Sequence, residues 1–500
     1  MNETRIEELK NARLHFMGIG GQGISAVAQM ALQEGARISG CDHAASATTR
    51  MLIEKGIAVE IGHSPEHLAN ADALIYVPAV VAFNPENAEL AAAHASGMQV
   101  MTWQEMLGIW MQGKCVLSVS GVHGKGTTTA MLALMLVNAG LDPTCEIGAI
   151  VPSFGVNYRI GKSQYFVNEA DEYNNNFLHY HPRLAVVTSI EFEHPEFFAD
   201  YTAFLEAFEH FIRGMDMHRA WTFPPTLVLN ADSPGCLELR ERLGDWSGRI
   251  LTYAVEGLLE ANATKTRPAY LAYDVQIEGE TSFRIRSQEL KEKAFPTDKV
   301  IHLKLPGVHN IQNALAAMTA ARCIGINDEV IMHVLENFSG IGRRFEIRYQ
   351  GPLQINGETC NVILIDDYAH HPTAITATLD AARKRFPGRR LIAVYQPHMY
   401  SRTKTFFAQF LTAFDSADVV LIADIYPGRE HDTGSIHARE LVEAMVKRPA
   451  FSSPEKRVMY SGNVENTATL LRNTLHSGDV TIVMGAGDIY AVTEKLLQRT

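Results

Sequence analysis

The feature that most constrains the fold of this chain is the alternation of short apolar runs with longer amphipathic stretches. Apolar runs occupy residues 14–17, 115–120 and 362–366, among others, and an amphipathic stretch follows each of them. Runs of this length fit buried β-strands, and a strand followed by an amphipathic helix is the repeating unit of a parallel sheet covered by helices. The sequence therefore predicts an α/β fold.

The length of the chain and the grouping of its apolar runs predict three domains. At roughly 100–200 residues per domain, 500 residues are enough for about three separate cores. A new series of predicted strands begins after polar or glycine-containing stretches, and we therefore expect domains at residues 1–112, 113–338 and 339–500. Within the second domain, residues 256–304 alternate polar with apolar side chains, which predicts antiparallel strands with one solvated face.

Charge and cysteine content exclude several classes of function. The chain carries 44 lysines and arginines against 56 aspartates and glutamates, a net charge of −12, which argues against nucleic acid or an anionic membrane as the main partner. Its six cysteines are scattered singly, which predicts neither a disulfide framework nor a zinc ribbon. The N-terminus is charged where a signal peptide is apolar, and no apolar run reaches about 18 residues, so we expect a cytoplasmic protein.

A glycine-rich segment follows the first predicted strand and leads into an apolar-periodic helix. Its glycines are Gly18, Gly20, Gly21 and Gly23. Backbone N–H groups at such a helix start bind phosphate, and Asp42, which ends the next strand, can accept a hydrogen bond from a ribose hydroxyl. The segment predicts a Rossmann-like first domain that binds a nucleotide diphosphate. Nicotinamide and uridine nucleotides remain alternatives at this point.

A second glycine-rich segment opens the expected central domain. Its loop residues are Gly121, Gly124, Lys125, Gly126, Thr127 and Thr128. The order of strand, loop and helix predicts a P-loop-type ATPase domain, in which backbone amides and Lys125 hold phosphates and a threonine hydroxyl binds Mg²⁺. Gly126 separates Lys125 from Thr127, which departs from the G-x₄-G-K-[ST] pattern.

Two acidic segments end neighbouring predicted strands of the same domain. Glu169 ends one strand, and residues 191–194 follow the strand predicted at 184–190. Both segments fall at the carboxyl edge of the sheet that also carries the Lys125 loop. Because Mg²⁺ prefers carboxylate, hydroxyl and phosphate oxygens, this edge predicts a magnesium site that includes Glu169.

Histidines and charged residues gather at two strand ends of the third expected domain, for which we expect a Rossmann-like fold. Asp367, Tyr368 and His370 follow one strand, and His398 and Arg402 follow the next. The donor fork of an arginine can grip both oxygens of a carboxylate. These segments therefore predict a binding cleft for a substrate with a carboxylate group.

In combination, these segments resemble the ATP-dependent Mur ligases of peptidoglycan synthesis, and the resemblance covers nearly the whole chain. Residues 18–25 are similar to the family's uridine-nucleotide loop, and residues 121–128 are similar to its ATP loop. Residues 307–316 resemble the segment on the adenine side of ATP, and residues 340–345 resemble the domain junction whose arginine reaches the γ-phosphate.

The resemblance implies a role for each candidate residue. It implies UDP-sugar binding by Gly18, Gly20, Gly21, Gly23 and Asp42. It implies ATP binding by Gly121, Gly124, Lys125, Gly126, Thr127, Thr128, His309, Asn310, Asn313, Arg343 and Arg344. It implies magnesium binding by Thr127, Glu169 and His194. It implies amino-acid binding by Tyr368, His398 and Arg402, with Lys125, Asp367 and His370 as catalytic residues.

The same resemblance implies a reaction. It implies a ligase that uses ATP and Mg²⁺ to join L-alanine to the carboxylate of UDP-N-acetylmuramate through an acyl phosphate, as a monomer or homodimer. The segment at residues 396–403 is closest to the alanine-adding members of the family. Residues 172–173 and 192–198 are closer to the recycling members, which attach a tripeptide to UDP-N-acetylmuramate.

Two hypotheses from other classes remain at this stage. A nicotinamide-dependent dehydrogenase would account for the first glycine loop and Asp42, but it leaves Lys125 and the third-domain segments without a use. A nucleotide-gated binding protein without catalysis would account for the departure at Gly126.

Overall fold

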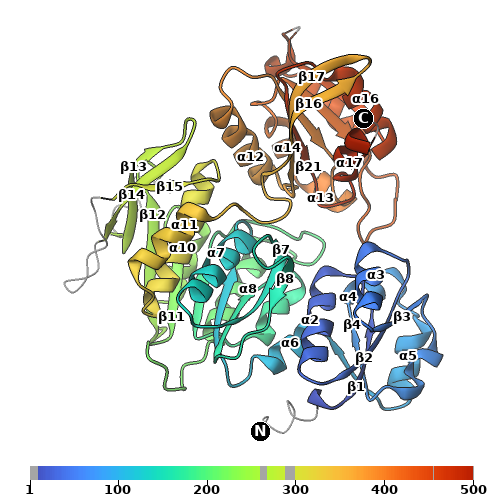
Figure 1. Ribbon diagram of the computed structural model, residues 1–500, viewed down its shortest axis with the longest axis vertical. Coiled ribbons are helices and arrows are strands. Elements are labelled where there is room, and N and C mark those ends of the chain that lie inside the picture. The colour runs from blue at the N-terminus through green and yellow to red at the C-terminus, as the bar shows by residue number, and fades with distance from the viewer. Residues whose placement is uncertain (1–8, 259–266, 288–298, 454, 499–500) are drawn as a thin grey trace.

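A computed structural model describes residues 9–258, 267–287, 299–453 and 455–498, which form three α/β domains (Figure 1). The predicted fold class is confirmed. Residues 1–8, on which the argument about a signal peptide rests, lie outside the described part of the chain. Among the described helices, none combines the length and the apolar composition that a membrane span needs.

The N-terminal domain is a five-stranded parallel sheet with the strand order β3-β2-β1-β4-β5. The strands are β1 (Arg13–Met17), β2 (Arg37–Asp42), β3 (Ala58–Ile61), β4 (Ala73–Tyr76) and β5 (Gln99–Thr102), and the helices are α2 (Gln22–Gln33), α3 (Ala47–Glu54), η1 (Pro65–Asn70), α4 (Pro78–Phe83), α5 (Ala88–Ala95) and α6 (Trp103–Trp110). The strand order changes direction between β1 and β4, so the glycine loop after β1 lies at the switch point where such sheets bind ligands.

The central domain is a ten-stranded sheet with the strand order β15-β14-β13-β12-β11-β10-β6-β9-β7-β8. The strands are β6 (Cys115–Ser120), β7 (Thr144–Val151), β8 (Val156–Arg159), β9 (Tyr165–Glu169), β10 (Leu184–Val187), β11 (Thr226–Asn230), β12 (Arg249–Val255), β13 (Tyr270–Gln276), β14 (Thr281–Ser287) and β15 (Ile301–Leu303). The helices are α7 (Lys125–Asn138), η2 (Tyr173–His179), α8 (Tyr201–Arg213), α9 (Pro234–Arg242), α10 (Val308–Cys323) and α11 (Asp328–Asn337). Strands β13, β14 and β15 pair antiparallel, as the alternating pattern in this region predicts.

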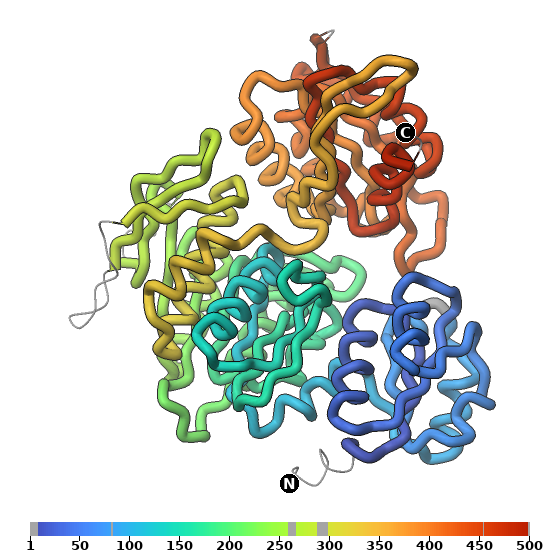
Figure 2. Tube along the Cα trace, viewed as in Figure 1, coloured from blue at the N-terminus to red at the C-terminus, as the bar shows by residue number. Residues whose placement is uncertain are grey.

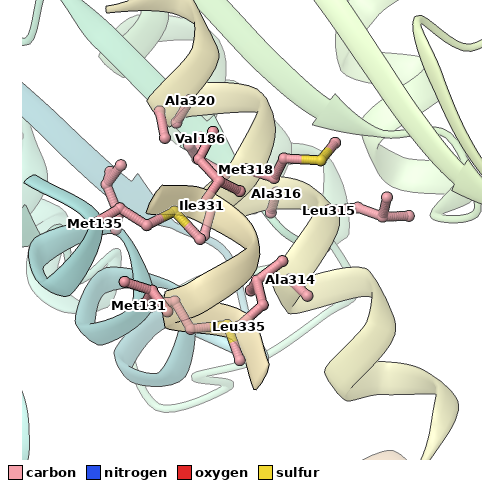
Figure 3. Close-up of a cluster of buried hydrophobic side chains, with 14 of the residues drawn as sticks. Met131, Met135, Val186, Ala314, Leu315, Ala316, Met318, Ala320, Ile331 and Leu335 are labelled. Atoms are coloured by element: carbon pink, nitrogen blue, oxygen red, sulfur yellow. The ribbon is translucent and has the colours of Figure 1, made fainter. Parts of the chain in front are cut away.

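The hydrophobic core of the central domain packs helix α7 against helix α10. Figure 3 shows Met131 and Met135 of α7 beside residues of α10 and α11, including Ala314, Ile331 and Leu335. These side chains are fully buried. Helix α7 begins at Lys125, and α10 begins one residue before His309, so this packing brings two predicted ATP-binding segments together.

The C-terminal domain is a six-stranded sheet with the strand order β16-β17-β21-β18-β19-β20, in which only the edge strand β16 is antiparallel. The strands are β16 (Glu346–Ile355), β17 (Glu358–Asp367), β18 (Leu391–Tyr395), β19 (Val419–Ala423), β20 (Arg457–Gly462) and β21 (Val480–Met484). The helices are α12 (Pro372–Arg385), α13 (Tyr400–Thr405), α14 (Phe407–Thr412), α15 (Ala438–Val446), η4 (Pro449–Phe451), α16 (Val464–Thr474) and α17 (Ala491–Gln498). Figure 2 shows the chain passing from α11 directly into this domain.

Candidate functional site

One cavity of about 1010 Å³ is lined by all three domains. Its lining includes Gln22, Gly23 and Trp103 of the N-terminal domain, Gly124, Lys125, Gly126, Glu169, Asp171, Glu172 and His194 of the central domain, and Arg343, Arg344, Tyr368, His370, His398 and Arg402 beyond the domain junction. Three predicted ligand sites that are far apart in the sequence therefore open into a common space.

The first glycine loop is held in place by Asp42. The backbone N–H of Gly20 donates to Asp42 Oδ2 at 2.8 Å, and a Cβ on Gly20 would come within 2.8 Å of the same oxygen. Gly23 packs against the indole of Trp103, which would lie 2.6 Å from an added Cβ. Asp42 therefore fixes the conformation of the loop, and the Trp103 indole leaves no room for a side chain at Gly23.

The second glycine loop fits tightly against α10. Gly124 has a φ of +80° and precedes the first residue of α7. A Cβ at this position would lie 2.2 Å from Asn313 Oδ1, the oxygen that accepts a hydrogen bond from Thr128 Oγ1 at 3.3 Å. Asn313 Nδ2 in turn donates to Asn310 Oδ1 at 3.2 Å. The predicted residues Thr128, Asn310 and Asn313 thus form one network that supports the loop.

His309 lies next to this network. Its Nε2 is 3.1 Å from Asn310 Nδ2, an amide nitrogen that also donates to Pro306 O at 2.8 Å. Burial, with the charges of His123 and Arg344 adding to it, lowers the pKa of His309 to about 4. The imidazole is therefore neutral at pH 7 and accepts the amide hydrogen at Nε2.

Lys125 is surrounded by three carboxylates. Its Nζ lies 2.8 Å from Glu172 Oε2 and 4.0 Å from Asp171 Oδ1. Burial alone would lower the pKa of Lys125, but the charges of Glu172, Asp171 and Glu169 outweigh this effect and raise it. Burial raises the pKa of both Glu169 and Glu172. The single positive charge of Lys125 is thus outnumbered by the nearby carboxylates. This excess of negative charge favours the binding of an additional cation.

The donor set around Lys125 fits Mg²⁺. Ligand atoms of Asp171, Glu172 and His194 lie within 4.8 Å of one another, while Glu169 lies against Gly126 and accepts a hydrogen bond from the Gly148 N–H at 3.0 Å. Carboxylate oxygens are the ligands that Mg²⁺ prefers, and phosphate oxygens supply the rest of such sites. The structure groups His194 with Asp171 and Glu172, which sequence reasoning did not select as ligands.

Thr127 and His194, the other two predicted magnesium ligands, have different surroundings. Thr127 is buried in the first turn of α7. His194 has a φ of +56°, and its Nδ1 contacts Glu196 Oε1 at 3.2 Å while its Nε2 lies 3.8 Å from Glu172 Oε1. The imidazole thus stands between two carboxylates.

The two arginines at the domain junction both stack on Tyr368, with guanidinium carbons 5.0 and 5.1 Å from the ring centre, but their other interactions differ. Arg343 Nη2 donates to the carbonyl oxygens of Gly485 and Gly487, at 2.6 and 3.3 Å. Arg344 lies over the ring of Tyr368, with its guanidinium carbon 5.1 Å from the ring centre, and its charge lowers the pKa of Glu169 against the larger effect of burial. Arg343 therefore binds a loop of the C-terminal domain, and Arg344 is the arginine whose charge acts on Glu169 beside the ATP loop.

Asp367 and His370 occupy different positions at the end of β17. Asp367 is buried, and its two oxygens accept hydrogen bonds from Phe345 N at 2.8 Å and Ala369 N at 2.7 Å. His370 lines the cavity, and its Nδ1 donates to Tyr368 O at 2.8 Å, so its Nε2 is the acceptor. Burial and the nearby Arg402 charge hold the pKa of His370 well below its usual range.

His398 and Arg402 meet a residue of the central domain. Arg402 Nε and Nη2 donate to Glu193 Oε1 at 2.8 and 2.7 Å, and Nη1 donates to His398 Nδ1 at 3.0 Å. Burial, together with the Arg402 charge, lowers the pKa of His398 to about 3, so its Nδ1 is free to accept. The predicted amino-acid site therefore includes an ion pair between two domains.

Sequence reasoning missed several contacts that cross domain boundaries. His123 Nε2 contacts Glu191, whose Oε2 accepts a hydrogen bond from Thr373 Oγ1 at 2.9 Å. The guanidinium carbon of Arg429 lies 3.8 Å from the ring centre of Tyr173. No local signal in the sequence pairs Glu191 with Thr373 or Tyr173 with Arg429, because each of these pairs is separated by more than 180 positions.

Three family descriptions match consecutive parts of the chain. Residues 13–114 match the Mur ligase family, catalytic domain; residues 119–321 match the Mur ligase middle domain; and residues 343–487 match the Mur ligase, glutamate ligase domain.

Similar proteins cover almost the full length. A UDP-N-acetylmuramate--L-alanine ligase of Acetivibrio thermocellus is 38% identical over 493 residues, which cover 98% of this chain and 96% of that protein. The crystal structure of a UDP-N-acetylmuramate-alanine ligase from Thermotoga maritima aligns with a TM-score of 0.76 at 25% identity and covers 98% of this chain and 99% of that one. A murein peptide ligase from Psychrobacter arcticus shares the fold, with a TM-score of 0.71 at 24% identity and 98% coverage of each chain.

Proposed function

This chain belongs to the Mur ligase family, and we propose that it joins L-alanine to the carboxylate of UDP-N-acetylmuramate in peptidoglycan precursor synthesis. It is an ATP-dependent ligase that forms an amide bond and releases ADP and phosphate. The observation that carries the proposal is the single cavity lined by the first glycine loop, the ATP loop and the His370–Arg402 region. A reaction with three substrates requires such a meeting point.

We assign a task to each domain. Residues 1–112 bind the UDP-sugar, residues 113–338 bind ATP, and residues 339–500 bind the amino acid. Because ATP is a substrate, we place the reaction in the cytoplasm, and we propose that the chain acts as a monomer or homodimer.

In the first step, the muramate carboxylate attacks the γ-phosphate of ATP and forms an acyl phosphate, with ADP as the leaving group. Backbone amides of the loop ending at Gly124 and the ammonium of Lys125 hold the phosphates, and the Arg344 guanidinium offsets the charge that develops on the transferred group. Glu169, Asp171, Glu172 and His194, with the Thr127 hydroxyl, are the residues that would hold Mg²⁺. When bound, Mg²⁺ supplies further charge neutralisation at the phosphates.

In the second step, the amine of L-alanine attacks the acyl phosphate and displaces phosphate. His370 Nε2 is a neutral acceptor at the cavity wall, which suits it to accept a hydrogen bond from the amine and orient it for attack. Asp367 holds the loop that carries His370 through its hydrogen bonds to Phe345 and Ala369.

The amino-acid carboxylate is assigned to Arg402, His398 and Tyr368. Three of the five N–H groups of the Arg402 guanidinium bind Glu193 and His398 in the contacts above, which leaves two for a substrate carboxylate. The ion pair with Glu193 fixes the guanidinium before substrate arrives, which reduces the entropy lost on binding.

The test is phosphate release from Mg-ATP and UDP-N-acetylmuramate with L-alanine, glycine, L-serine or the recycling tripeptide as acceptor. We expect release that depends on L-alanine, with formation of the matching amide product. Lys125→Ala should abolish turnover, whereas Lys114→Ala, which removes a lysine bound to Ser163 O outside the cavity, should not.

The other outcomes identify the alternatives. Release only with the tripeptide would assign the chain to recycling. Release with none of the acceptors would point to a binding protein, and fluorescence of bound NADH would point to a dehydrogenase.

A further inference from the structure

A second cluster of metal-capable side chains lies in the N-terminal domain, apart from the cavity. His15 is on β1, Cys41 on β2, His67 in η1 and Glu89 on α5, and one ligand atom from each lies within 4.8 Å of the others. The proposed function uses none of these four residues. Although they are spread over 75 positions of the chain, the parallel pairing of β1 with β2 brings the first two together.

The cluster is buried and two of its nitrogens lack hydrogen bonds. His15 is 1% exposed and Glu89 is fully buried. Within the described part of the chain, His15 Nε2 and His67 Nδ1 are buried atoms without a hydrogen-bond partner of good geometry. Both nitrogens nevertheless point at the same carboxylate, since they lie 2.9 and 3.5 Å from Glu89 Oε1. Burying a carboxylate beside imidazole nitrogens costs free energy unless a positive charge, such as a proton or a metal ion, lies between them.

The distances between the donor atoms fit a tetrahedral metal. Measured from Glu89 Oε1, Cys41 Sγ and His67 Nδ1 both lie at 3.5 Å, and His15 Nε2 lies at 2.9 Å. Around a tetrahedral Zn²⁺, with metal–nitrogen bonds of about 2.0 Å and metal–sulfur bonds of about 2.3 Å, neighbouring donor atoms are roughly 3.3–3.8 Å apart. The Cys41 and His67 spacings fall within this range, and His15 Nε2 would have to move slightly away from the Glu89 oxygen when an ion binds between them.

We propose that His15, Cys41, His67 and Glu89 bind a structural Zn²⁺. The combination of imidazole, thiolate and carboxylate suits Zn²⁺, whereas Mg²⁺ and Ca²⁺ select oxygen ligands. His63 lies beside the site, with its Nδ1 3.2 Å from Cys41 Sγ, and fits the outer partner that orients a metal-bound sulfur. The side chains of His63 and His67 are 19% and 17% exposed, so the metal has a path of entry from solvent.

The proposed ion has a structural consequence for the nucleotide loop. Cys41 immediately precedes Asp42, the residue that holds Gly20 of the first glycine loop. An ion bound to His15 and Cys41 would link the middle of β1 to the C-terminal end of β2, and through His67 and Glu89 it would link both strands to η1 and α5. The site therefore stabilises the domain that carries the UDP-sugar loop without touching the ligand.

The test is the metal content of the full chain and the spectrum of its cobalt form. We expect close to one zinc per chain by mass spectrometry after gel filtration. Replacement by Co²⁺ should give the near-ultraviolet absorption of a cobalt–thiolate bond. Two other groups of metal-capable side chains occur among the described residues, His123 with Glu191 and His371, and His194 with Asp171 and Glu172. Neither group contains a cysteine, so neither would produce this band. Cys41→Ala and His67→Ala should remove zinc, and Cys360→Ala, another buried strand cysteine, should retain it.

A chain that takes up neither zinc nor cobalt, or a Cys41→Ala variant that keeps zinc and the cobalt band, would overturn the proposal. If Cys41→Ala does not fold, two measurements on the unaltered chain replace it. A cobalt–thiolate band and a fall in melting temperature on chelation would support the proposal, and the absence of both would contradict it. These readouts are independent of ligase turnover, so they stand whether or not the proposed reaction is correct.

Discussion

The Arg402 guanidinium of the C-terminal domain lies against the Glu193 carboxylate of the central domain, with Nε and Nη2 at 2.8 and 2.7 Å from the same oxygen. The two side chains are only 3% and 5% exposed. Burial alone would raise the pKa of Glu193, but Arg402 and nearby histidines hold it well below its usual range. The pair connects two domains at the wall of the cavity, so it bears on domain closure as well as on substrate binding.

Glu193→Ala should destabilise the contact between these domains strongly, because it leaves Arg402 buried without its partner. Loss of one member of a buried pair costs about 3–5 kcal/mol, whereas an exposed pair contributes about 0–1 kcal/mol. We expect a fall in the melting temperature and a higher KM for L-alanine. Arg213→Ala, which breaks an exposed pair with Glu209 on α8, is the control. Equal effects of the two variants would contradict the prediction.

Arg344→Ala should lower kcat, and Arg343→Ala should act mainly through stability. Arg344 is the arginine whose charge reaches Glu169 at the ATP loop, while Arg343 donates to carbonyl oxygens of the C-terminal domain. Loss of one group that stabilises transition-state charge costs about 10²–10³-fold in kcat. Steady-state kinetics and thermal melting of both variants test whether the two arginines have these separate roles. A larger loss of kcat in Arg343→Ala than in Arg344→Ala, at an unchanged melting temperature, would contradict the prediction.

Gly124→Ala should raise the KM for ATP by at least about tenfold, since a Cβ at this position would collide with Asn313 Oδ1 at 2.2 Å. Gly140→Ala is a matched control at the other end of α7. Gly140 has a φ of +73°, close to the +80° of Gly124, but open space surrounds its Cβ position. The control should show only the backbone strain of about 1–2 kcal/mol and an ordinary KM. Similar KM values in both variants would mean that strain alone matters.

The stability of the central domain should fall below pH 6.5 partly through His309, whose pKa in the folded chain is about 4. Between these values the unfolded chain binds a proton that the folded chain does not, so the free energy of unfolding rises with pH across this window. His309→Gln removes this contribution, so its melting temperature should depend less on pH between 4 and 6.5 than that of the unaltered chain. His302→Gln, at an exposed position on β15, is the control. An unchanged slope in His309→Gln would contradict the assignment.

Much of the fold and the location of the site follow from local sequence. The strand, glycine loop and helix at Gly18 and at Lys125 were predictable, because steric freedom at glycine and the amides of a helix start act over a few residues. The placement of His370 and Arg402 at strand ends was predictable for a similar reason, because parallel strands present their carboxyl ends at one edge.

The functions of individual side chains within that site were less predictable. Asp367 is predicted from the sequence as a catalytic residue beside His370, and in the structure both of its oxygens accept backbone hydrogen bonds. Glu172 reads as one of several acidic residues, yet it is the carboxylate in contact with Lys125. The hydrogen-bond partner of each carboxylate oxygen depends on shifts in atomic position of less than 1 Å. Those positions are set by the packing of helices and strands that are distant in the sequence.

The sequence by itself determined the α/β class, the phosphate loops and the candidate residues, because hydrophobic period and loop chemistry are local properties. The tertiary structure alone decided that Arg402 pairs with Glu193, that Arg343 binds the Gly485 carbonyl while the Arg344 charge acts on Glu169, and that His15 and Cys41 converge on Glu89. These relationships join residues from different strands or domains, and only the register of the sheets and the docking of the domains bring them within a few ångströms of one another.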